Sequence, residues 1–589
     1  MKPYRATDAA WEHMGRSPIA HLRVPFGSLR WRAEKQGFQT AEVLSFSLHN
    51  GRAAQEGTTL NLSLTASGTG PNGMVRVRGG EVYVQFPGIE KAVSVVNLPD
   101  YWMDRYEVTN TQFKEFVDAG GYRKPEYWKQ PFTENGKTLS FQEATSRFRD
   151  KDGRPGPATW DLGNYPEGQR DYPVTGISWY EAAAYAEFAG KSLPTAHQWQ
   201  NAAWTGLASD IVPLSNFEGR GLATVGSHQG MSSYGIYDMA GNAKEWCWNA
   251  TKNKRFILGG AWNEPPYMFV DGDAQSPFDR LPTYGFRCVK EIAGTSLPKT
   301  ALEPISSRFR DFARVKPVSD QVFAALKNLY RYDTGPLGAI TDPVEESSEY
   351  WTRQKVTFNA AYGNERMSAY VYLPRNSKPP FETVVFFPSS DAVFERSSKD
   401  LDLFGCAFII KSGRAFVYPI YKSHYERGDG LPYDDPDETA RYRDHVIYWA
   451  KDLGRTIDYL ETRKDLNLEK LAYYGISTGA YLGNILPAVE NRIRVAVLLG
   501  GGFEAAKKMP EVDELNFAPR VKAPTLLVSG RYDFYFPLEL QNMMFRSLGT
   551  PEKDKRHVVL EGGEIPVLAY DQMVKEILDW LDKYQGPVK

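Results

Sequence analysis

The stretch that most constrains the fold of this chain is residues 470–479, which read KLAYYGISTG. Residues 471–474 form a short apolar run typical of a buried strand, and the residues from Ala480 onward have helical character. GxSxG by itself is a weak pattern, but its two glycines allow a sharp turn, and a strand before and a helix after it give the context of a nucleophile elbow. We therefore expect Ser477 to be a nucleophile, and the backbone N–H of Thr478 to be one donor to an oxyanion.

Length and composition set the broad class of protein. A chain of 589 residues is too long for one hydrophobic core, so about three domains are expected. Lys and Arg number 70 and Asp and Glu 72, a balance that gives no electrostatic reason to propose nucleic acid or an acidic membrane surface as a partner. Three cysteines, Cys247, Cys288 and Cys406, lie far apart, which excludes a disulfide framework and a cysteine-rich zinc site. The sequence has no run of about 18 apolar residues and predicts no transmembrane segment.

Residues 1–73 alternate short apolar segments with Gly, Pro and Asn, the pattern of a small antiparallel β domain. Within them, GRSPIAHLRVPFGSLRWRAEKQGFQT resembles the PEGA-type β-sandwich repeat of bacterial surface and signalling proteins. We therefore expect a PEGA-like β-sandwich, joined to the next domain by the glycine-rich residues 66–73. The first residues lack the apolar segment of a signal peptide and begin abruptly, so we expect a truncated protein and leave its compartment open.

Residues 74–290 are dense in Trp, Gly, Asn and turn residues and poor in regular periodicity. Six phrases occur in order: DRYEVTN at 104–110, PVTGISWYEA at 173–182, GKSLPT at 190–195, MAGNAKEW at 239–246, GGAW at 259–262 and GFRC at 285–288. Together they resemble the formylglycine-generating enzyme (sulfatase-modifying factor) family across the whole domain. The resemblance implies a C-type-lectin-like α+β fold that is poor in regular secondary structure.

The chain matches only part of the metal chemistry of that family. Oxidase members bind copper through two cysteines, one of them soon after the GG-[SA]-[WYF] phrase, but GGAW runs here into NEPPYM and Cys288 lies beyond the place of the pair. Without a thiolate pair there is no soft-metal redox site, which argues against an oxidase. The iron-dependent branch uses a histidine triad, and the isolated His197 and His228 are unlike it.

A calcium site is the metal hypothesis that remains for this domain. The family supplies hard oxygen ligands from the GNxxEW phrase, so the resemblance implies calcium bound by Asn242 and Glu245. The alternative is that both side chains only satisfy neighbouring groups in a loop-rich fold. Glu107 and Asn110 are interpreted as structural.

Residues 291–345 hold scattered Pro, Ser, Thr and Lys and are expected to be a linker with one helical segment. Residues 346–589 begin with two strands and then alternate helices and strands, which predicts a mostly parallel sheet covered on both faces. With the elbow, this region resembles the α/β-hydrolase fold, most nearly its dienelactone-hydrolase-like and prolyl-oligopeptidase-like members. Residues 503–520 are interpreted as a short lid and residues 422–438 as a second rim.

The resemblance also assigns the partners of Ser477, because α/β-hydrolases place their triad in the chain order Ser, Asp, His. Asp533 ends the phrase SGRYD after a predicted strand and is the expected orienting carboxylate. The histidine usually occupies a phrase of the form GGHxP, which reads here GGEIP, so Glu564 stands in the histidine position. A second oxyanion donor is expected from the loop of Ser389 and Ser390.

A glutamate in this position changes the expected chemistry. Imidazole has one nitrogen for the serine and another for the aspartate, whereas a glutamate has no N–H to offer Asp533. Two adjacent carboxylates repel each other, which raises one pKa. His557 opens the preceding strand, so most of the length of that strand separates it from Ser477. His424 lies on a rim loop, from which it could approach the mouth of the site, and His445 lies in a long helix; packing or surface roles are typical of both positions.

The sequence therefore predicts a carboxylic ester hydrolase of the serine type whose activity is impaired by Glu564, with the lectin-like domain as a binding or lid-forming partner. The alternative is a noncatalytic module that binds a saccharide, in keeping with the 13% of aromatic residues, or a protein partner. A copper-dependent oxidase is the third possibility. In related multidomain bacterial proteins these domains follow a Ser/Thr kinase, and no kinase motif occurs in this sequence.

Overall fold

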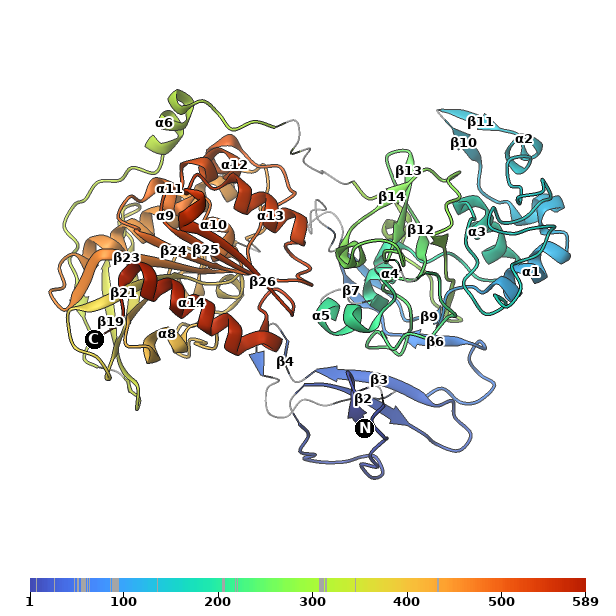
Figure 1. Ribbon diagram of the computed structural model, residues 1–589, viewed down its shortest axis with the longest axis horizontal. Coiled ribbons are helices and arrows are strands. Elements are labelled where there is room, and N and C mark those ends of the chain that lie inside the picture. Colours follow the sequence, from blue (N-terminus) through green and yellow to red (C-terminus); the bar gives the residue numbers. More distant parts are fainter. Residues whose placement is uncertain are drawn as a thin grey trace. The chain divides into compact units, whose positions relative to one another are not determined.

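The computed structural model describes residues 1–589 except 7, 26, 47, 50–51, 54–59, 61, 63, 85, 87–94, 135, 204–206, 218, 220, 307–311, 313–314, 345, 432–433 and 589. The chain forms two compact units, Met1–Ser307 and Arg308–Lys589, which are described separately (Figure 1). The boundary between them falls within residues 291–345, the stretch expected to be a linker. Among the described residues, no helix combines the length and the apolar character needed to cross a membrane.

The first unit opens with a three-stranded antiparallel sheet in the order β1-β2-β3, made of Lys2–Pro3, Ser28–Ala33 and Ala41–Phe46. A short hairpin, β4 (Leu48–His49) and β5 (Arg52–Ala53), follows. The sheet packs onto the rest of the unit through the buried Tyr4, whose hydroxyl donates to the carbonyl of Met231 at 3.1 Å and accepts from its N–H at 2.7 Å. Residues 1–73 therefore share one compact unit with the domain that follows.

The rest of this unit is built from small sheets and long loops, as the C-type-lectin-like resemblance implies (Figure 1). One sheet has the order β16-β9-β6 (Val289–Glu291, Tyr101–Asp104, Met74–Val77) and another the order β14-β13-β12-β15 (Ala274–Gln275, Lys254–Leu258, Lys244–Thr251, Tyr284–Gly285). Two hairpins pair β7 with β8 (Gly80–Val82, Val96–Leu98) and β10 with β11 (Phe132–Glu134, Lys137–Leu139). The helices are α1 (Asn110–Asp118), α2 (Phe141–Thr145), α3 (Trp179–Phe188), α4 (Ala196–Ala203) and α5 (Ala208–Ile211).

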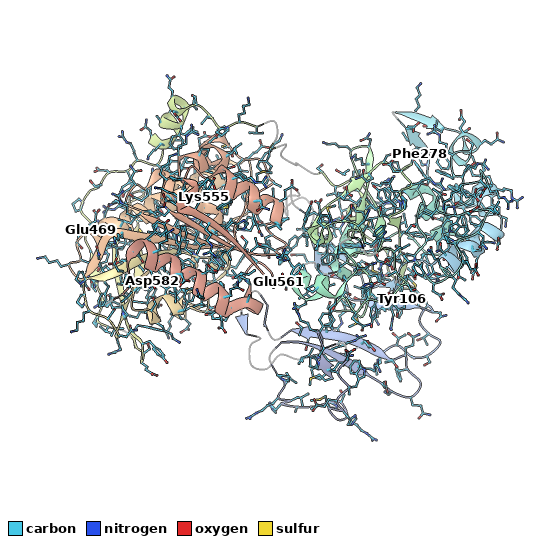
Figure 2. All side chains as sticks on the ribbon, viewed as in Figure 1. Tyr106, Phe278, Glu469, Lys555, Glu561 and Asp582 are labelled. Carbon is cyan, nitrogen blue, oxygen red and sulfur yellow. The ribbon has the colours of Figure 1, made fainter. Side chains whose placement is uncertain are left out.

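Local sequence signals and aromatic packing hold these elements in place. Helices α1, α2 and α3 each begin with a capping box, and in α3 the Ser178 hydroxyl accepts from the N–H of Glu181 while the Glu181 carboxylate accepts from Ser178. The core is dominated by buried aromatic rings. Phe278, labelled in Figure 2, packs against Tyr180 with 4.8 Å between ring centroids. Such aromatic pairs stabilise a fold that has little regular hydrogen-bonded structure.

The second unit is organised around one large sheet with the strand order β17-β19-β20-β22-β21-β23-β24-β25-β26, with β18 paired to β19. Its strands are Ile340–Thr341, Glu346–Ser347, Trp351–Asn359, Arg366–Pro374, Phe381–Phe387, Ala415–Pro419, Leu466–Ile476, Val495–Leu499, Thr525–Gly530 and Lys555–Leu560, from β17 to β26. Strand β20 is antiparallel to both of its neighbours, and every pair from β22–β21 to β25–β26 is parallel. The short edge strands β17 and β18 are antiparallel to β19, and the longer strands, with β20 reversed among them, have the arrangement of the α/β-hydrolase fold.

Helices cover both faces of the sheet (Figure 1). The helices of the described part of this unit are α6 (Asp320–Asn328), which packs against α12, and α7 (Asp391–Phe394), α8 (Ala407–Lys411), α9 (Ala440–Leu460), α10 (Thr478–Leu482), α11 (Leu486–Val489), α12 (Glu514–Phe517), α13 (Leu538–Ser547) and α14 (Tyr570–Gln585). Consecutive residues of one strand enter different cores: Leu498 packs with α9 and α10, and Val497 packs with α8 and α14. Both faces of the parallel strands are thus apolar, which agrees with the continuous hydrophobic runs in the sequence.

Candidate active site

Ser477 lies between β23 and α10 in a strained backbone conformation, with φ 54° and ψ −113°. A positive φ is unusual for a residue with a side chain and occurs mainly where the surrounding structure holds it in place. The Ser477 N–H donates to the carbonyl of Leu499 on β24 at 2.9 Å, which anchors the turn. A Cβ at Gly479 would collide with the carbonyl of Phe387, and a Cβ at Gly475 would collide with the carbonyl of Gly479. Only glycine fits at these two positions, and the Ser477 side chain is left partly exposed.

The parallel strands bring the expected partners of Ser477 to the same edge of the sheet. Asp533 follows β25, Glu564 follows β26, and Ser389 and Ser390 follow β21. Glu564 lies near enough to both the Ser477 hydroxyl and Asp533 for each to affect the ionisation of its carboxyl group. Glu564 is 5% exposed and Asp533 2% exposed, so both carboxylates are removed from water. The structure therefore assembles Ser477, Glu564 and Asp533 in one array.

The two carboxylates of this array share a buried environment with few hydrogen-bond donors. Oδ1 of Asp533 accepts from the N–H groups of Tyr535 and Phe536, both at 2.9 Å, while its Oδ2 and Oε1 of Glu564 have no hydrogen-bond partner. Burial raises the pKa of Asp533 to about 7. Burial, together with the nearby Asp533, raises the pKa of Glu564 well above its usual range. The two N–H groups favour the ionised form of Asp533, so of the two carboxyl groups Glu564 is the one that holds a proton more readily.

The side chains of the expected oxyanion residues are engaged with one another. Thr478 Oγ1 donates to Oδ2 of Asp434 at 2.8 Å and lies 2.8 Å from Ser390 Oγ. Ser389 Oγ donates to Oδ2 of Asp391 at 3.1 Å. A substrate oxyanion would therefore be bound by backbone N–H groups of Thr478 and of the loop at Ser389 and Ser390. The role of these residues stays a prediction.

Among the described residues, no histidine is hydrogen-bonded to Ser477. His557 lies on β26 with Nε2 3.2 Å from Ser529 Oγ, and burial lowers its pKa to about 4. His424 is 1% exposed, and burial lowers its pKa to about 3. His445 pairs with Oδ2 of Asp429 at 2.9 Å. Glu564 is thus the titratable group that lies near the hydroxyl.

Several acidic residues near this array escaped the sequence analysis. Asp434 bonds to Thr478, and Glu504 lies close enough to Glu564 and Asp434 to interact with both charges. Asp434 lies in residues 422–438, the expected second rim, and Glu504 in residues 503–520, the expected lid. The latter segment contains the fully buried Phe503 and Phe517, so it is packed into the core. In the sequence, the one feature that could have indicated these acidic residues is the adjacent pair Asp434 and Asp435.

In the first unit, the residues expected to bind calcium are occupied by other contacts. Oε1 of Glu245 accepts from Arg287 Nη2 at 2.5 Å, and its Oε2 accepts from Arg287 Nε at 2.7 Å and from Trp199 Nε1 at 2.8 Å. Oδ1 of Asn242 accepts from Asn216 at 3.0 Å and from the N–H of Ala223 at 2.9 Å. A guanidinium lies where a calcium ion would have to approach, so this donor set does not fit calcium. The contacts match the alternative, that both side chains satisfy neighbouring groups.

The cysteines and other metal-binding side chains of the first unit are the next feature to consider. Among the described residues, no group of three or more His, Cys, Asp or Glu side chains is arranged to hold a metal ion. Cys247 and Cys288 are buried, and burial raises the pKa of both thiols well above the usual range. After the GGAW phrase, Oε1 of Glu264 accepts from Lys244 Nζ at 2.8 Å. The segment that follows the GGAW phrase therefore carries an ion pair.

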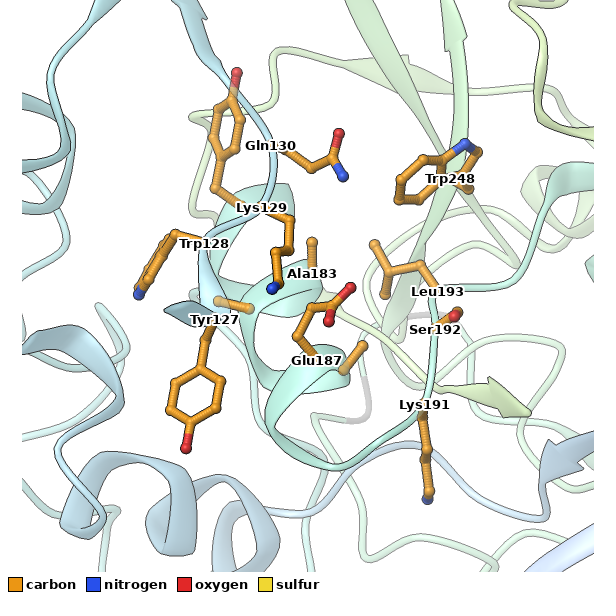
Figure 3. A pocket seen from close by; sticks show the side chains of 13 residues that line it. Tyr127, Trp128, Lys129, Gln130, Ala183, Glu187, Lys191, Ser192, Leu193 and Trp248 are labelled. Carbon is orange, nitrogen blue, oxygen red and sulfur yellow. The ribbon is translucent and has the colours of Figure 1, made fainter. Parts of the chain in front are cut away.

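A small cavity in the first unit lies beside helix α3 (Figure 3). Its volume is about 30 Å³, and its lining includes Trp128, Glu187, Lys191 and Trp248. Ligand pockets typically have volumes of about 300–1,000 Å³, so this cavity has room for water molecules only. It gives no support to a saccharide-binding site.

Comparisons with known proteins give a family match that lies within the first unit. Residues 63–292 match the family described as sulfatase-modifying factor enzyme 1-like domain. The formylglycine-generating enzyme of Thermomonospora curvata is 31% identical over 228 residues, which cover 31% of this chain and 73% of that protein. The serine/threonine-protein kinase pkn1 of Chlamydia pneumoniae is 30% identical over 252 residues, which cover 37% of this chain and 38% of the kinase. The chain thus spans about two fifths of the length of the first curated relatives. Acetyl xylan esterase 1 from Thermoanaerobacterium sp. JW/SL YS485 aligns with a TM-score of 0.36 and 13% identity, over 45% of this chain and 95% of the esterase.

The class that fold and site define is a fusion of a C-type-lectin-like domain with an α/β-hydrolase domain. The chain belongs, through its first unit, to the formylglycine-generating enzyme (sulfatase-modifying factor) family.

The buried Arg287–Glu245 pair generates a stability prediction. Both side chains are 0% exposed, so Arg287→Met leaves the Glu245 charge buried without its partner, and we expect the first unit to lose about 3–5 kcal/mol of unfolding free energy. Arg76→Met, which breaks the exposed Arg76–Asp100 pair, is the control and should cost less than about 1 kcal/mol. Urea unfolding measures both. If Arg287→Met lost no more unfolding free energy than the control, a buried charge at Glu245 would be contradicted. The same would follow if adding Glu245→Gln to Arg287→Met recovered none of the loss.

The hydrogen bonds already made by Glu245 and Asn242 lead to a second prediction, which concerns calcium binding. Because the carboxylate of Glu245 and the amide of Asn242 already bind protein groups, calcium or a chelator should leave the melting temperature of the unmodified protein unchanged. Differential scanning calorimetry with calcium and with EDTA measures this. A lower melting temperature in EDTA, restored by calcium and absent in Glu245→Gln, would reinstate the calcium site.

Proposed function

We propose that the second unit is a carboxylic ester hydrolase that acts through Ser477, with Glu564 in the position of the usual histidine and Asp533 beside it. The observation that carries this proposal is the strained elbow at Ser477, at the same edge of the sheet as the buried Glu564 and Asp533. A noncatalytic loop serine would need neither the positive φ nor a buried titratable partner.

The reaction follows from what each group can do. Ser477 Oγ attacks the carbonyl carbon of the ester, and its proton passes to Glu564 in the ionised form. Backbone N–H groups at Thr478 and in the loop of Ser389 and Ser390 stabilise the oxyanion. Collapse of the tetrahedral intermediate breaks the bond to the alcohol, which leaves with the proton from Glu564. Water then attacks the acyl-serine by the same steps and releases the acid.

The carboxylate pair makes this hydrolase slow at neutral pH. Glu564 accepts the serine proton only when ionised, and its burial beside Asp533 raises its pKa and so disfavours the ionised form. Asp533 has no N–H partner to orient, as it would have with an imidazole. We therefore propose that Ser477 is a functional nucleophile and that Glu564 is a weak base.

The second candidate is a noncatalytic binding or sensing module, in which both units present surfaces to a ligand or a protein. Two observations favour it: Glu564 replaces the histidine, and an ion pair of Lys244 and Glu264 replaces the cysteine chemistry of the first unit. Similarity to a bacterial kinase is in keeping with a signalling context. Hydrolysis experiments separate the two candidates.

The proposal predicts a gain of function on restoring the histidine. Glu564→His should raise kcat/KM for p-nitrophenyl acetate by about 10²–10⁴-fold, because an imidazole both accepts and returns the proton near neutral pH. Adding Ser477→Ala to this variant should abolish the gain. Glu564→Gln, which keeps the size but cannot titrate, is the matched control and should be no faster than the unmodified protein. A gain that survives Ser477→Ala, or no turnover by any variant, would contradict the proposal and favour the binding module.

The raised pKa of Glu564 also predicts the pH dependence. Only the ionised form is a base, so below the raised pKa of Glu564 the Ser477-dependent rate should rise about tenfold per pH unit, to pH values well above the usual range of a glutamate. Glu564→His should instead level off above about pH 7, because imidazole titrates near pH 6.5. Rates of Ser477→Ala, subtracted at each pH, remove hydrolysis by hydroxide. A rate for the unmodified protein that peaks at acid pH would show that Glu564 ionises readily, contrary to its buried environment.

A further inference from the structure

Two hydrogen bonds beside Ser477 join three separate segments of the second unit. The hydroxyl of Thr478, the first residue of α10, donates to Oδ2 of Asp434 at 2.8 Å. Thr478 has one hydroxyl proton, so Ser390 Oγ, which lies 2.8 Å from Thr478 Oγ1, is the donor in the second bond. We call these three side chains, Ser390, Thr478 and Asp434, the Asp434 link.

The members of the Asp434 link follow three different strands at the carboxyl edge of the sheet. Ser390 comes after β21, Thr478 after β23, and Asp434 lies between β22 and α9. The strand order β22-β21-β23 places these strands next to one another. The two bonds connect residues that are 44 and 88 positions apart in the chain. The link therefore ties neighbouring loops together at the edge where Ser477 lies.

Asp434 is the buried end of the link. It is 5% exposed, whereas the other two members are partly exposed. The loop that carries Asp434 is attached to the core by the buried Leu431 and braced by Asp429, whose Oδ1 accepts from Ser423 Oγ at 2.7 Å. A buried carboxylate is costly unless it is hydrogen-bonded, so the bond from Thr478 holds both side chains in place.

Thr478 and Ser390 also carry backbone groups that the proposed mechanism assigns to the oxyanion. In the described part of the chain, no atom accepts a hydrogen bond from the N–H of Thr478 or of Ser390. Both residues are partly exposed, so a substrate can reach this part of the edge. The separation of the two N–H groups depends on how the loop after β21 lies against the start of α10, and the Asp434 link ties those two segments to each other.

We propose that Asp434 is a positioning residue for the oxyanion site: it holds Thr478 and, through it, Ser390, and so sets the separation of their two N–H groups. The effect on rate rests on the proposed hydrolase function, and the hydrogen-bonded link does not. Donors stabilise an oxyanion only where its charge develops, and a misplacement of about 1 Å can cost about 10²-fold in rate. Asp434 therefore acts through its neighbours and not on the substrate.

The first experiment tests the link in the full chain without any reaction, by hydrogen–deuterium exchange and mass spectrometry. Asp434→Ala should speed exchange about threefold or more in peptides that cover residues 386–394 and 476–484, because both segments lose a bond that holds them together. Thr478→Val should give the same increase, and the double variant no further increase. Ser423→Ala, which removes a hydroxyl-to-carboxylate bond elsewhere in the same loop, is the control and should leave both peptides unchanged. Unchanged exchange in Asp434→Ala would overturn the proposal.

The second experiment separates positioning from chemistry. In Glu564→His, adding Asp434→Ala should lower kcat for p-nitrophenyl acetate about 10–100-fold and change KM less than about threefold, because the oxyanion forms only in the transition state. Asp434→Asn keeps an acceptor oxygen for Thr478 and should recover most of the lost kcat. Ser477-dependent turnover with the same kcat in Asp434→Ala, or equal losses in Asp434→Ala and Asp434→Asn, overturns the positioning role while the hydrolase function stands. Faster exchange in Asp434→Ala, without Ser477-dependent turnover by any variant, supports the link and overturns the hydrolase function.

Discussion

Ser477 holds a backbone conformation that costs about 1–3 kcal/mol for a residue with a side chain, and its neighbours in the second unit are arranged to keep it there. Its N–H is bonded to Leu499 of the next strand, and the glycines at 475 and 479 let β21, β23 and α10 meet without a collision. Relaxing the turn would separate α10 from the sheet and withdraw the hydroxyl from the edge where the other loops converge. The exposure of the Ser477 hydroxyl and the close approach of β23 and α10 therefore depend on each other.

The charge of the site depends on the same convergence. Loops that leave parallel strands at one edge bring carboxylates near one another although they are far apart in sequence, as Asp533 and Glu564 are. Burial beside Asp533 raises the pKa of Glu564, which makes it a weaker base than a histidine in the same position. A glutamate in place of a histidine at position 564 thus changes the chemistry of the site without moving the residue, because the sheet determines where residue 564 lies.

The first unit follows another principle, in which buried charges are neutralised by protein groups. Arg287 compensates Glu245, and Lys244 lies between Glu264 and Asp273. Buried ion pairs of this kind contribute little net stability, but each partner becomes indispensable once the other is buried. The family fold is retained around these pairs while its cysteine chemistry is absent.

The sequence by itself determined the family of the first unit, the α/β fold of the second and the elbow at Ser477, because each depends on local patterns: ordered phrases, alternating apolar segments and glycines at fixed spacing. The phrase GGEIP also determined that a glutamate replaces the histidine at position 564. Only the tertiary structure decided what surrounds these residues. The engagement of Glu245 by Arg287 and the approach of Glu504 to Glu564 are long-range contacts, and no spacing in the chain encodes them. Ionisation follows from burial and from neighbouring charges, which exist only after the strands have paired and their loops have converged.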